Sequence, residues 1–355
     1  MEFVQVDGSK GEGGGQILRT AISFSVIQKK PVRIENIRAG REVPGLRRQH
    51  LSALHVLAAV FGGELRGATE GSRTVIFVPG EQRLQTLSYD MGTAASITLV
   101  LQAIVPAIAL AHSRLELALT GGTDVPWSPT YDYFERVVRE AYGLIGIRFE
   151  VAAGRRGYYP RGGGRVTASI EPSAGVSSVE LTARGEIPGA RLVSRCGMLP
   201  RHVAERQLSS ASEFLRKLGI KVSQADATEE ESDSPGSSIL VYHAGSGAIL
   251  GSDGIGAKGR PAEEVGREAA TRFAAAVRST ACLDSNLADM VLPLLSLAPD
   301  PSRIVIPEVT SHLKSGLQIA AQFTGCTWSA KEHRSGFVVA VHPNTDGIRR
   351  PGHNV

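Results

Sequence analysis

Cysteine, lysine and aromatic residues are scarce in this chain of 355 residues. Its three cysteines, Cys196, Cys282 and Cys326, lie far apart and form no C-x-x-C pair. That spacing excludes a disulfide framework and the usual zinc and redox motifs. The first residues read as a strand and lack the charged and apolar regions of a signal peptide. We therefore expect a cytoplasmic protein.

Long apolar runs are also few. Residues 91–112 come closest to a membrane span, but Ser96, Thr98, Gln102 and Pro106 interrupt them, and they fall inside a repeating pattern. This run therefore predicts a buried helix, and we expect no membrane partner.

The basic residues are mostly arginine, since only eight of the 39 are lysine and the net charge is +4. A guanidinium group suits bidentate contacts with phosphate better than an ammonium group does. A genome rich in G and C produces the same bias, so the composition leaves both explanations open.

Glycine is abundant, with 40 residues, and two Gly- and Arg-rich stretches stand near the N-terminus. The first is Gly11-Glu12-Gly13-Gly14-Gly15-Gln16 with Arg19, and the second covers residues 37–50. Each follows a strand-like run and opens an apolar helical pattern, so backbone N–H groups and arginines can converge on an anion. Neither fits a Walker A or dinucleotide fingerprint, and glycine-rich runs also form ordinary turns.

The order strand, helix, strand, helix, strand, strand occurs three times. The copies cover residues 2–79, residues 83–171, and residues 178–183 continued at 271–341. Three βαβαββ units predict an α+β fold in which each sheet carries helices on one face. In the third copy we expect a helix over 271–298, broken near 280–285.

The interruption in the third copy predicts a division into domains. We expect a large domain of residues 1–184 and 266–342, a small inserted domain of residues 185–265, and a mobile tail of residues 343–355. The inserted segment should contain a helix over 202–218, two strands, and a polar acidic loop over 224–238.

Equivalent helix starts in the three units carry Gln49-His50, Thr130-Tyr131 and Ser311-His312. At a helix start the dipole favours bound anions and a neutral, nucleophilic imidazole, which makes His312 a candidate nucleophile. A capping or core histidine is the alternative. His50 stands beside Arg47 and Arg48, where it fits either a phosphate contact or a solvated basic helix start.

Three further features have a functional and a structural interpretation. Glu12 among phosphate-binding amides suits a divalent metal, or is a turn residue that faces solvent. The run from Thr120 to Pro129, with Tyr131 and Tyr133, could clamp a base or form a rigid turn. The segment that begins at Asn286 offers polar groups for a ribose, or is a plain helix.

These motifs resemble one family over nearly the whole chain, the RNA 3′-terminal phosphate cyclases. Its first signature is similar to Asp7-Gly8 with residues 11–19, and its second to residues 37–41, 44–46 and 48–51. Further similar segments are Leu99-Val100-Leu101-Gln102, Gly121-Gly122-Thr123, Gly157-Tyr158-Tyr159-Pro160 with Gly162-Gly163-Gly164, Leu287-Ala288-Asp289 and Ser311-His312-Leu313.

The resemblance implies a body of three repeats, like the C-terminal domain of a bacterial translation initiation factor, plus an inserted small domain. It also implies an ATP-dependent ligase: His312 takes AMP from ATP, the adenylyl group passes to an RNA 3′-phosphate, and the 2′-hydroxyl displaces AMP to leave a 2′,3′-cyclic phosphate. Covalent catalysis of this kind divides a difficult displacement into easier ones.

Site residues follow from the resemblance as expectations. Glu12 would hold a divalent metal, Mg or Mn. The phosphates of RNA and ATP would contact Arg19, Arg38, Arg41, Arg48, Gln49 and His50. The rest of ATP would contact Gln102, Pro129, Tyr133, Asn286, Leu287, Ala288, Asp289 and Met290.

The chain departs from the family pattern at three positions that bear on ATP affinity. Gly316 stands where Asn is common, Met290 where Gln is common, and Asn286 where an aromatic residue or histidine is usual. The candidate nucleophile, His312, is in place.

Two other functions compete with this interpretation. One is a non-catalytic relative that binds RNA or protein in ribosome assembly, which would lack the histidine. The other is an enolpyruvyl transferase, which does not need it. A homodimer is one arrangement that the sequence leaves open.

Overall fold

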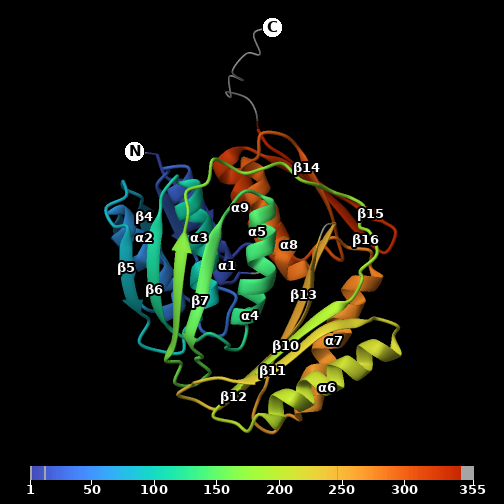
Figure 1. The fold of residues 1–355 in the computed structure, drawn as a ribbon. Coiled ribbons are helices and arrows are strands. Elements are labelled where there is room, and N and C mark those ends of the chain that lie inside the picture. Colours follow the sequence, from blue (N-terminus) through green and yellow to red (C-terminus); the bar gives the residue numbers. More distant parts are fainter. Residues whose placement is uncertain (1, 12, 246, 345–355) are drawn as a thin grey trace.

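The computed structural model describes residues 2–11, 13–245 and 247–344. Their strands form four sheets of four strands each, and helices pack between three of these sheets (Figure 1). Among the described residues, no helix has the length and apolar character needed to cross a bilayer.

The first unit pairs its four strands in the order β1-β2-β4-β3. The first two strands are parallel and the other pairs are antiparallel. The second helix ends at Gly62, which has a φ of +58°, a conformation that favours glycine. The elements are β1 Val4–Asp7, α1 Gly15–Ile27, β2 Val32–Glu35, α2 Arg48–Phe61, β3 Glu64–Arg66 and β4 Val75–Val78.

The second unit repeats this topology in the order β5-β6-β8-β7. Its first helix begins at Ile97, later than the start of the apolar run over 91–112, because Ser96 Oγ accepts a hydrogen bond from Leu99 N at 3.1 Å and caps the helix there. The elements are β5 Thr86–Asp90, α3 Ile97–Leu110, β6 Leu115–Gly121, α4 Tyr131–Tyr133, a π-helical turn Phe134–Val138, α5 Arg139–Leu144, β7 Phe149–Arg155 and β8 Gly164–Ile170.

The third unit has the same order again, β9-β14-β16-β15, which confirms the predicted α+β fold of three βαβαββ units. α9 begins at Ser311, where we expect a helix start. The elements are β9 Glu180–Leu181, α8 Ser285–Val291 with a 3₁₀ continuation Leu292–Leu297, β14 Ser302–Ile306, α9 Ser311–Thr324, β15 Thr327–His333 and β16 Gly336–His342.

The segment inside the third unit forms the fourth sheet, in the order β11-β10-β12-β13. The prediction of two strands and an acidic loop over 224–238 is wrong, because that stretch holds most of β11 and the start of β12. β11 is a polar edge strand that pairs with β10, and its polar composition gives no sign of a strand in the sequence. The elements are β10 Ala190–Gly197, α6 His202–Lys217, β11 Val222–Glu229, β12 Gly236–Gly245, β13 Ala248–Ile255 and α7 Ala262–Arg278.

The helix expected over 271–298 is two helices. The first, α7, begins at Ala262 and packs its apolar side, including Val265 and Phe273, into the core of the fourth sheet. The chain then breaks near residue 280, as predicted, and α8 begins at Ser285. Residue 265, where we expect the inserted domain to end, thus falls inside α7, and the division into domains stays a prediction.

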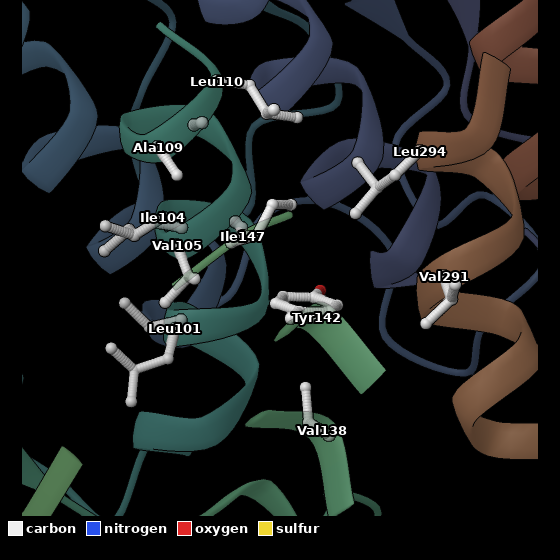
Figure 2. Packing of buried hydrophobic residues seen from close by; sticks show 14 of the residues in the cluster. Leu101, Ile104, Val105, Ala109, Leu110, Val138, Tyr142, Ile147, Val291 and Leu294 are labelled. Carbon is white, nitrogen blue, oxygen red and sulfur yellow. The ribbon is translucent and has the colours of Figure 1, made fainter. Parts of the chain in front are cut away.

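The main core lies among the helices of the three units. α1 packs against α3 and α9, and α8 packs against α9. Figure 2 shows part of this core, where Leu101 and Val105 of α3 lie near Tyr142 of α5, and Val291 and Leu294 face them from the segment that begins with α8. This packing holds the first turns of several helices around one cavity.

Candidate functional site

A cavity of about 250 Å³ lies where the first turns of α1, α4, α8 and α9 meet α3 and β13. It brings together eight of the residues that we expect in the site: Arg19, Gln102, Pro129, Tyr133, Asn286, Asp289, Met290 and His312. It is also lined by Gln16, Leu99, Trp127, Ser128 and Asp253.

His312 is the second residue of α9, and its side chain is exposed at the cavity. Thr310 fixes this helix start, since its Oγ1 accepts a hydrogen bond from Leu313 N at 2.9 Å. The same hydroxyl donates to Asp289 Oδ1 at 2.6 Å. The start of α9 is therefore tied to α8 across the cavity, and its N-terminal dipole favours an anion beside His312.

Asp289 is an acidic group held at this helix start by Thr310. Burial raises the pKa of Asp289, while the hydrogen bond from Thr310 and the charge of His312 act in the opposite direction. Gln16 Nε2 of α1 also donates to the backbone oxygen of Asp289 at 3.4 Å. The first and third units thus meet directly at the cavity.

The glycine-rich loop packs closely against α9 and α2. A β-carbon at Gly11, where φ is +62°, would overlap Ser315 Oγ of α9, and one at Gly15 would overlap His50 Nε2. α1 begins after Gly14, which has no side chain to cap the helix, and the first N–H groups of a helix are suited to bind an anion or water.

Glu12, which we expect to hold a metal, lies outside the described residues, so its role stays a prediction. Within residues 2–11, 13–245 and 247–344, no three or more His, Cys, Asp and Glu side chains are grouped to hold a metal ion.

His50 is buried behind Arg19, with 2% of its surface exposed. Its Nδ1 accepts a hydrogen bond from Arg47 N at 3.1 Å, so the neutral ring carries its proton on Nε2. Burial first, and then the charges of Arg19, Arg38 and Arg47, lower the pKa of His50 to about 3. The ring is thus a neutral hydrogen-bond donor beside the start of α1.

The other expected phosphate contacts do not line the cavity. Arg38 Nη1 donates to Val43 O at 2.7 Å and to Gly45 O at 3.2 Å, so this arginine braces its own loop. Arg48 lies at the start of α2, with its Nε 3.6 Å from Glu70 Oε2. In this second Gly- and Arg-rich stretch, Arg41 and Arg48 are exposed, Arg38 and Gln49 are half-buried, and His50 is buried.

Leu287 and Ala288, which we expect to contact ATP, do not line this cavity, and their contact with ATP stays a prediction. Both are fully buried in the main core on the side of α8 that faces away from the cavity. Their neighbours Asn286, Asp289 and Met290 line the cavity, because residues three and four apart share one face of a helix.

Asp284 joins three elements behind the cavity wall. Its Oδ1 caps α8 by accepting from Leu287 N at 3.0 Å, and it also accepts from Tyr133 Oη at 2.8 Å. Its Oδ2 accepts from Gly251 N of β13 at 2.8 Å. Burial raises the pKa of Asp284 to about 6, against these hydrogen bonds.

Asp253 brings the fourth sheet to the cavity. It lies on β13, lines the cavity, and its Oδ2 accepts a hydrogen bond from Thr130 N at 2.6 Å, beside the start of α4. Burial raises its pKa. Sequence reasoning missed Asp253 and Asp284, although one signal was present: a single carboxylate inside an apolar strand, Ala248–Ile255, needs a partner.

The chain is similar to proteins of one known family over most of its length. A family model described as RNA 3′-terminal phosphate cyclase matches residues 10–330. A curated protein of that name from Caldivirga maquilingensis is 39% identical over 97% of this chain and 99% of its own length. Those from Pyrococcus furiosus and Hyperthermus butylicus are 44% and 41% identical over 93% and 89% of this chain, and over 95% and 90% of their own lengths.

Proposed function

Because this chain belongs to the RNA 3′-terminal phosphate cyclase family, we propose that it uses ATP to convert an RNA 3′-phosphate into a 2′,3′-cyclic phosphodiester through adenylated His312. One observation carries the proposal: an exposed histidine at a helix start shares a small cavity with Arg19, Gln102 and Asp289. A nucleophile and anion-binding groups thus occupy the same space.

In the first step, a ring nitrogen of His312 attacks the α-phosphorus of ATP. A P–N bond forms, the bond between the α-phosphorus and the bridging oxygen breaks, and pyrophosphate leaves. Negative charge grows on the phosphate oxygens, and the N–H groups of α1, Arg19 and the neutral Nε2–H of His50 are suited to stabilise it.

In the second step, an oxygen of the RNA 3′-phosphate attacks the same phosphorus, and the P–N bond breaks to regenerate His312. The product is an RNA end joined to AMP by an anhydride. The vicinal 2′-oxygen then attacks the RNA phosphorus, its proton passes to a base or to water, and AMP leaves. AMP is a far better leaving group than the phosphate oxygen it replaces.

The remaining expected residues form two groups, one for the nucleoside of ATP and one for the phosphates of ATP and RNA. Gln102, Pro129, Tyr133, Asn286, Asp289 and Met290 line the part of the cavity suited to the nucleoside. Arg38, Arg41, Arg48, Gln49 and His50 would serve the RNA terminal phosphate and the triphosphate. A divalent ion, Mg²⁺ or Mn²⁺, held by Glu12 and phosphate oxygens would neutralise charge, which fits the preference of Mg²⁺ for few protein ligands.

The test uses an RNA with a labelled 3′-phosphate and ATP labelled at the α-phosphate. The wild-type protein should make the RNA end resistant to phosphatase and should retain acid-labile label in the presence of a divalent metal. The His312→Ala variant should do neither. Phosphatase resistance without ATP, or undiminished activity of the variant, would contradict the proposal. A non-catalytic binding protein would bind the RNA and change nothing.

A further inference from the structure

Trp127 is the most exposed of the large hydrophobic side chains in the described part of the chain, at 96%. It also lines the cavity that contains His312. An indole offers a large apolar surface, and leaving that surface in water forgoes the stabilisation that burial would give. A tryptophan so exposed at the edge of a polar cavity therefore calls for an external partner.

The backbone holds Trp127 in a fixed and unfavourable conformation. Its φ is +61°, in the left-handed region that bulky residues rarely adopt. The turn is braced on both sides, because Ser128 Oγ donates to Val125 O at 2.8 Å and Thr130 N donates to Asp253. Strain of this kind persists where the surroundings enforce it, and it is concentrated at functional sites.

Trp127 is also the aromatic side chain best placed to meet a ligand. Two other aromatic rings line the cavity. Tyr133 is 1% exposed and its hydroxyl is engaged by Asp284, and the imidazole of His312 is the proposed nucleophile. Asn286 of α8 also lines the cavity, but its side chain is an amide without a ring. Among the described lining residues, a flat π-face open to a ligand is thus offered by Trp127.

We propose that the indole of Trp127 stacks on a nucleobase of a substrate held at this cavity. The inference rests on the proposed function, which supplies two bases: the adenine of ATP and the terminal base of the RNA. Stacking fits both, because every base has a π-face, and it predicts binding with little preference for base identity at this contact. Pro129 lies two residues away on the same wall and offers a second apolar surface.

The experiment compares Trp127→Ala with Trp127→Phe, and uses Tyr159→Ala as the matched control. Tyr159 is an aromatic residue that is 68% exposed and does not line the cavity. The apparent dissociation constant for ATP is measured by single-turnover adenylation. The apparent dissociation constant for RNA is measured by cyclisation on pre-adenylated protein. Trp127→Ala should raise at least one constant about 5- to 100-fold, Trp127→Phe should restore most of the loss, and Tyr159→Ala should change neither.

The two measurements, one with ATP and one with RNA, identify the base that stacks on Trp127. A rise in the ATP constant alone assigns the adenine, and a rise in the RNA constant alone assigns the RNA end. If both constants stay within twofold of wild type, the proposal is overturned, and the indole serves another partner such as a protein.

A second readout does not depend on catalysis. The chain has two tryptophans, so Trp328→Phe leaves Trp127 as the single indole. ATP or the RNA should quench its fluorescence in a saturable manner, and the absence of quenching by both would overturn the stacking. If wild-type protein fails to adenylate but the quenching is present, the proposed function fails while the nucleobase contact stands.

Discussion

The two sides of the cavity hold their charged groups in different ways. On the acidic side, Asp253 and Asp289 line the cavity with Asp284 behind them, and each accepts hydrogen bonds from its own chain. On the cationic side, Arg19 lines the cavity with His50 behind it, next to the uncapped start of α1. The carboxylates of the acidic side accept hydrogen bonds from the protein itself, whereas the other side brings together the guanidinium of Arg19, His50 and the first N–H groups of α1.

This difference indicates how a nucleotide should lie. Because the carboxylates of the acidic side are engaged in fixing α4, α8 and α9, we expect that side to serve as a rigid wall for the nucleoside. The cationic side offers N–H groups and a guanidinium where phosphate charge can be placed. The predictions below test this division, beginning with the largest expected effect.

Removing the charge of the cationic side should damage catalysis most. Arg19→Ala should lower kcat/KM for adenylation about 100- to 1,000-fold, about 3 to 4 kcal/mol, because a preorganised donor to the phosphate is lost. Single-turnover adenylation at varied ATP measures this, with the maximal rate divided by the apparent constant for ATP taken as kcat/KM. The matched control is Arg33→Ala, an exposed arginine of the same unit that pairs with Glu35. Equal activity of both variants would remove Arg19 from the phosphate site.

Removing a carboxylate of the acidic side should mainly cost stability. Asp284→Ala leaves Tyr133 Oη, Leu287 N and Gly251 N without their acceptor. We expect the free energy of unfolding to fall by about 2 to 3 kcal/mol, measured by urea denaturation. The exposed Glu263→Ala on α7 is the control and should change it far less, because a solvent-exposed ion pair contributes little. Similar losses in both variants would refute the central position of Asp284.

Protonation of His50 should make the protein sensitive to acid. The folded chain keeps His50 neutral down to about pH 3, whereas the unfolded chain takes up a proton near its usual pKa of about 6.5. Between these values the unfolded state binds more protons, so stability falls as pH falls, by about 2 kcal/mol from pH 7 to pH 5.

His50→Asn tests this, since asparagine can keep the acceptor for Arg47 N while it removes the titration. Urea denaturation at pH 7 and pH 5 should show that the variant loses about 2 kcal/mol less than the wild type on acidification. Parallel losses in both proteins would show that His50 is not held neutral.

The smallest effect should come from one hydroxyl of the acidic side. Tyr133→Phe removes one of the donors to Asp284 and keeps the ring in the core. We expect a loss of about 1 kcal/mol in the free energy of unfolding and little change in the pyrophosphate-releasing step. A large fall in the adenylation rate at saturating ATP would instead place the hydroxyl in the chemistry.

The repeats could be predicted from the sequence because their signals are local. Thr310 followed by a regular apolar pattern up to Gly325 defines both ends of α9, and the same type of cap at Ser96 explains why α3 begins later than its apolar run. β11 could not be recognised, since a polar edge strand has no alternating pattern and depends on pairing with β10.

Residues that line the cavity could be predicted where motifs stand at helix starts, and could not be predicted where distant segments meet. Arg19 and His312 follow recognisable motifs, and both line the cavity. Asp253 reaches it through the fold of β13 against α4, a contact between residues more than a hundred positions apart. Asp289 and Ala288 are neighbours in one motif but lie on different faces of α8, so that only Asp289 lines the cavity. A motif alone does not show which of its residues face the cavity.

The most direct test of the account is the intact mass of the protein after exposure to ATP and a divalent metal, followed by peptide mapping under conditions that preserve P–N bonds. We predict a gain of one adenylyl group, located on His312, that disappears when an RNA 3′-phosphate is added. An unchanged mass, or an adenylyl group that persists in His312→Ala, would contradict the central claim.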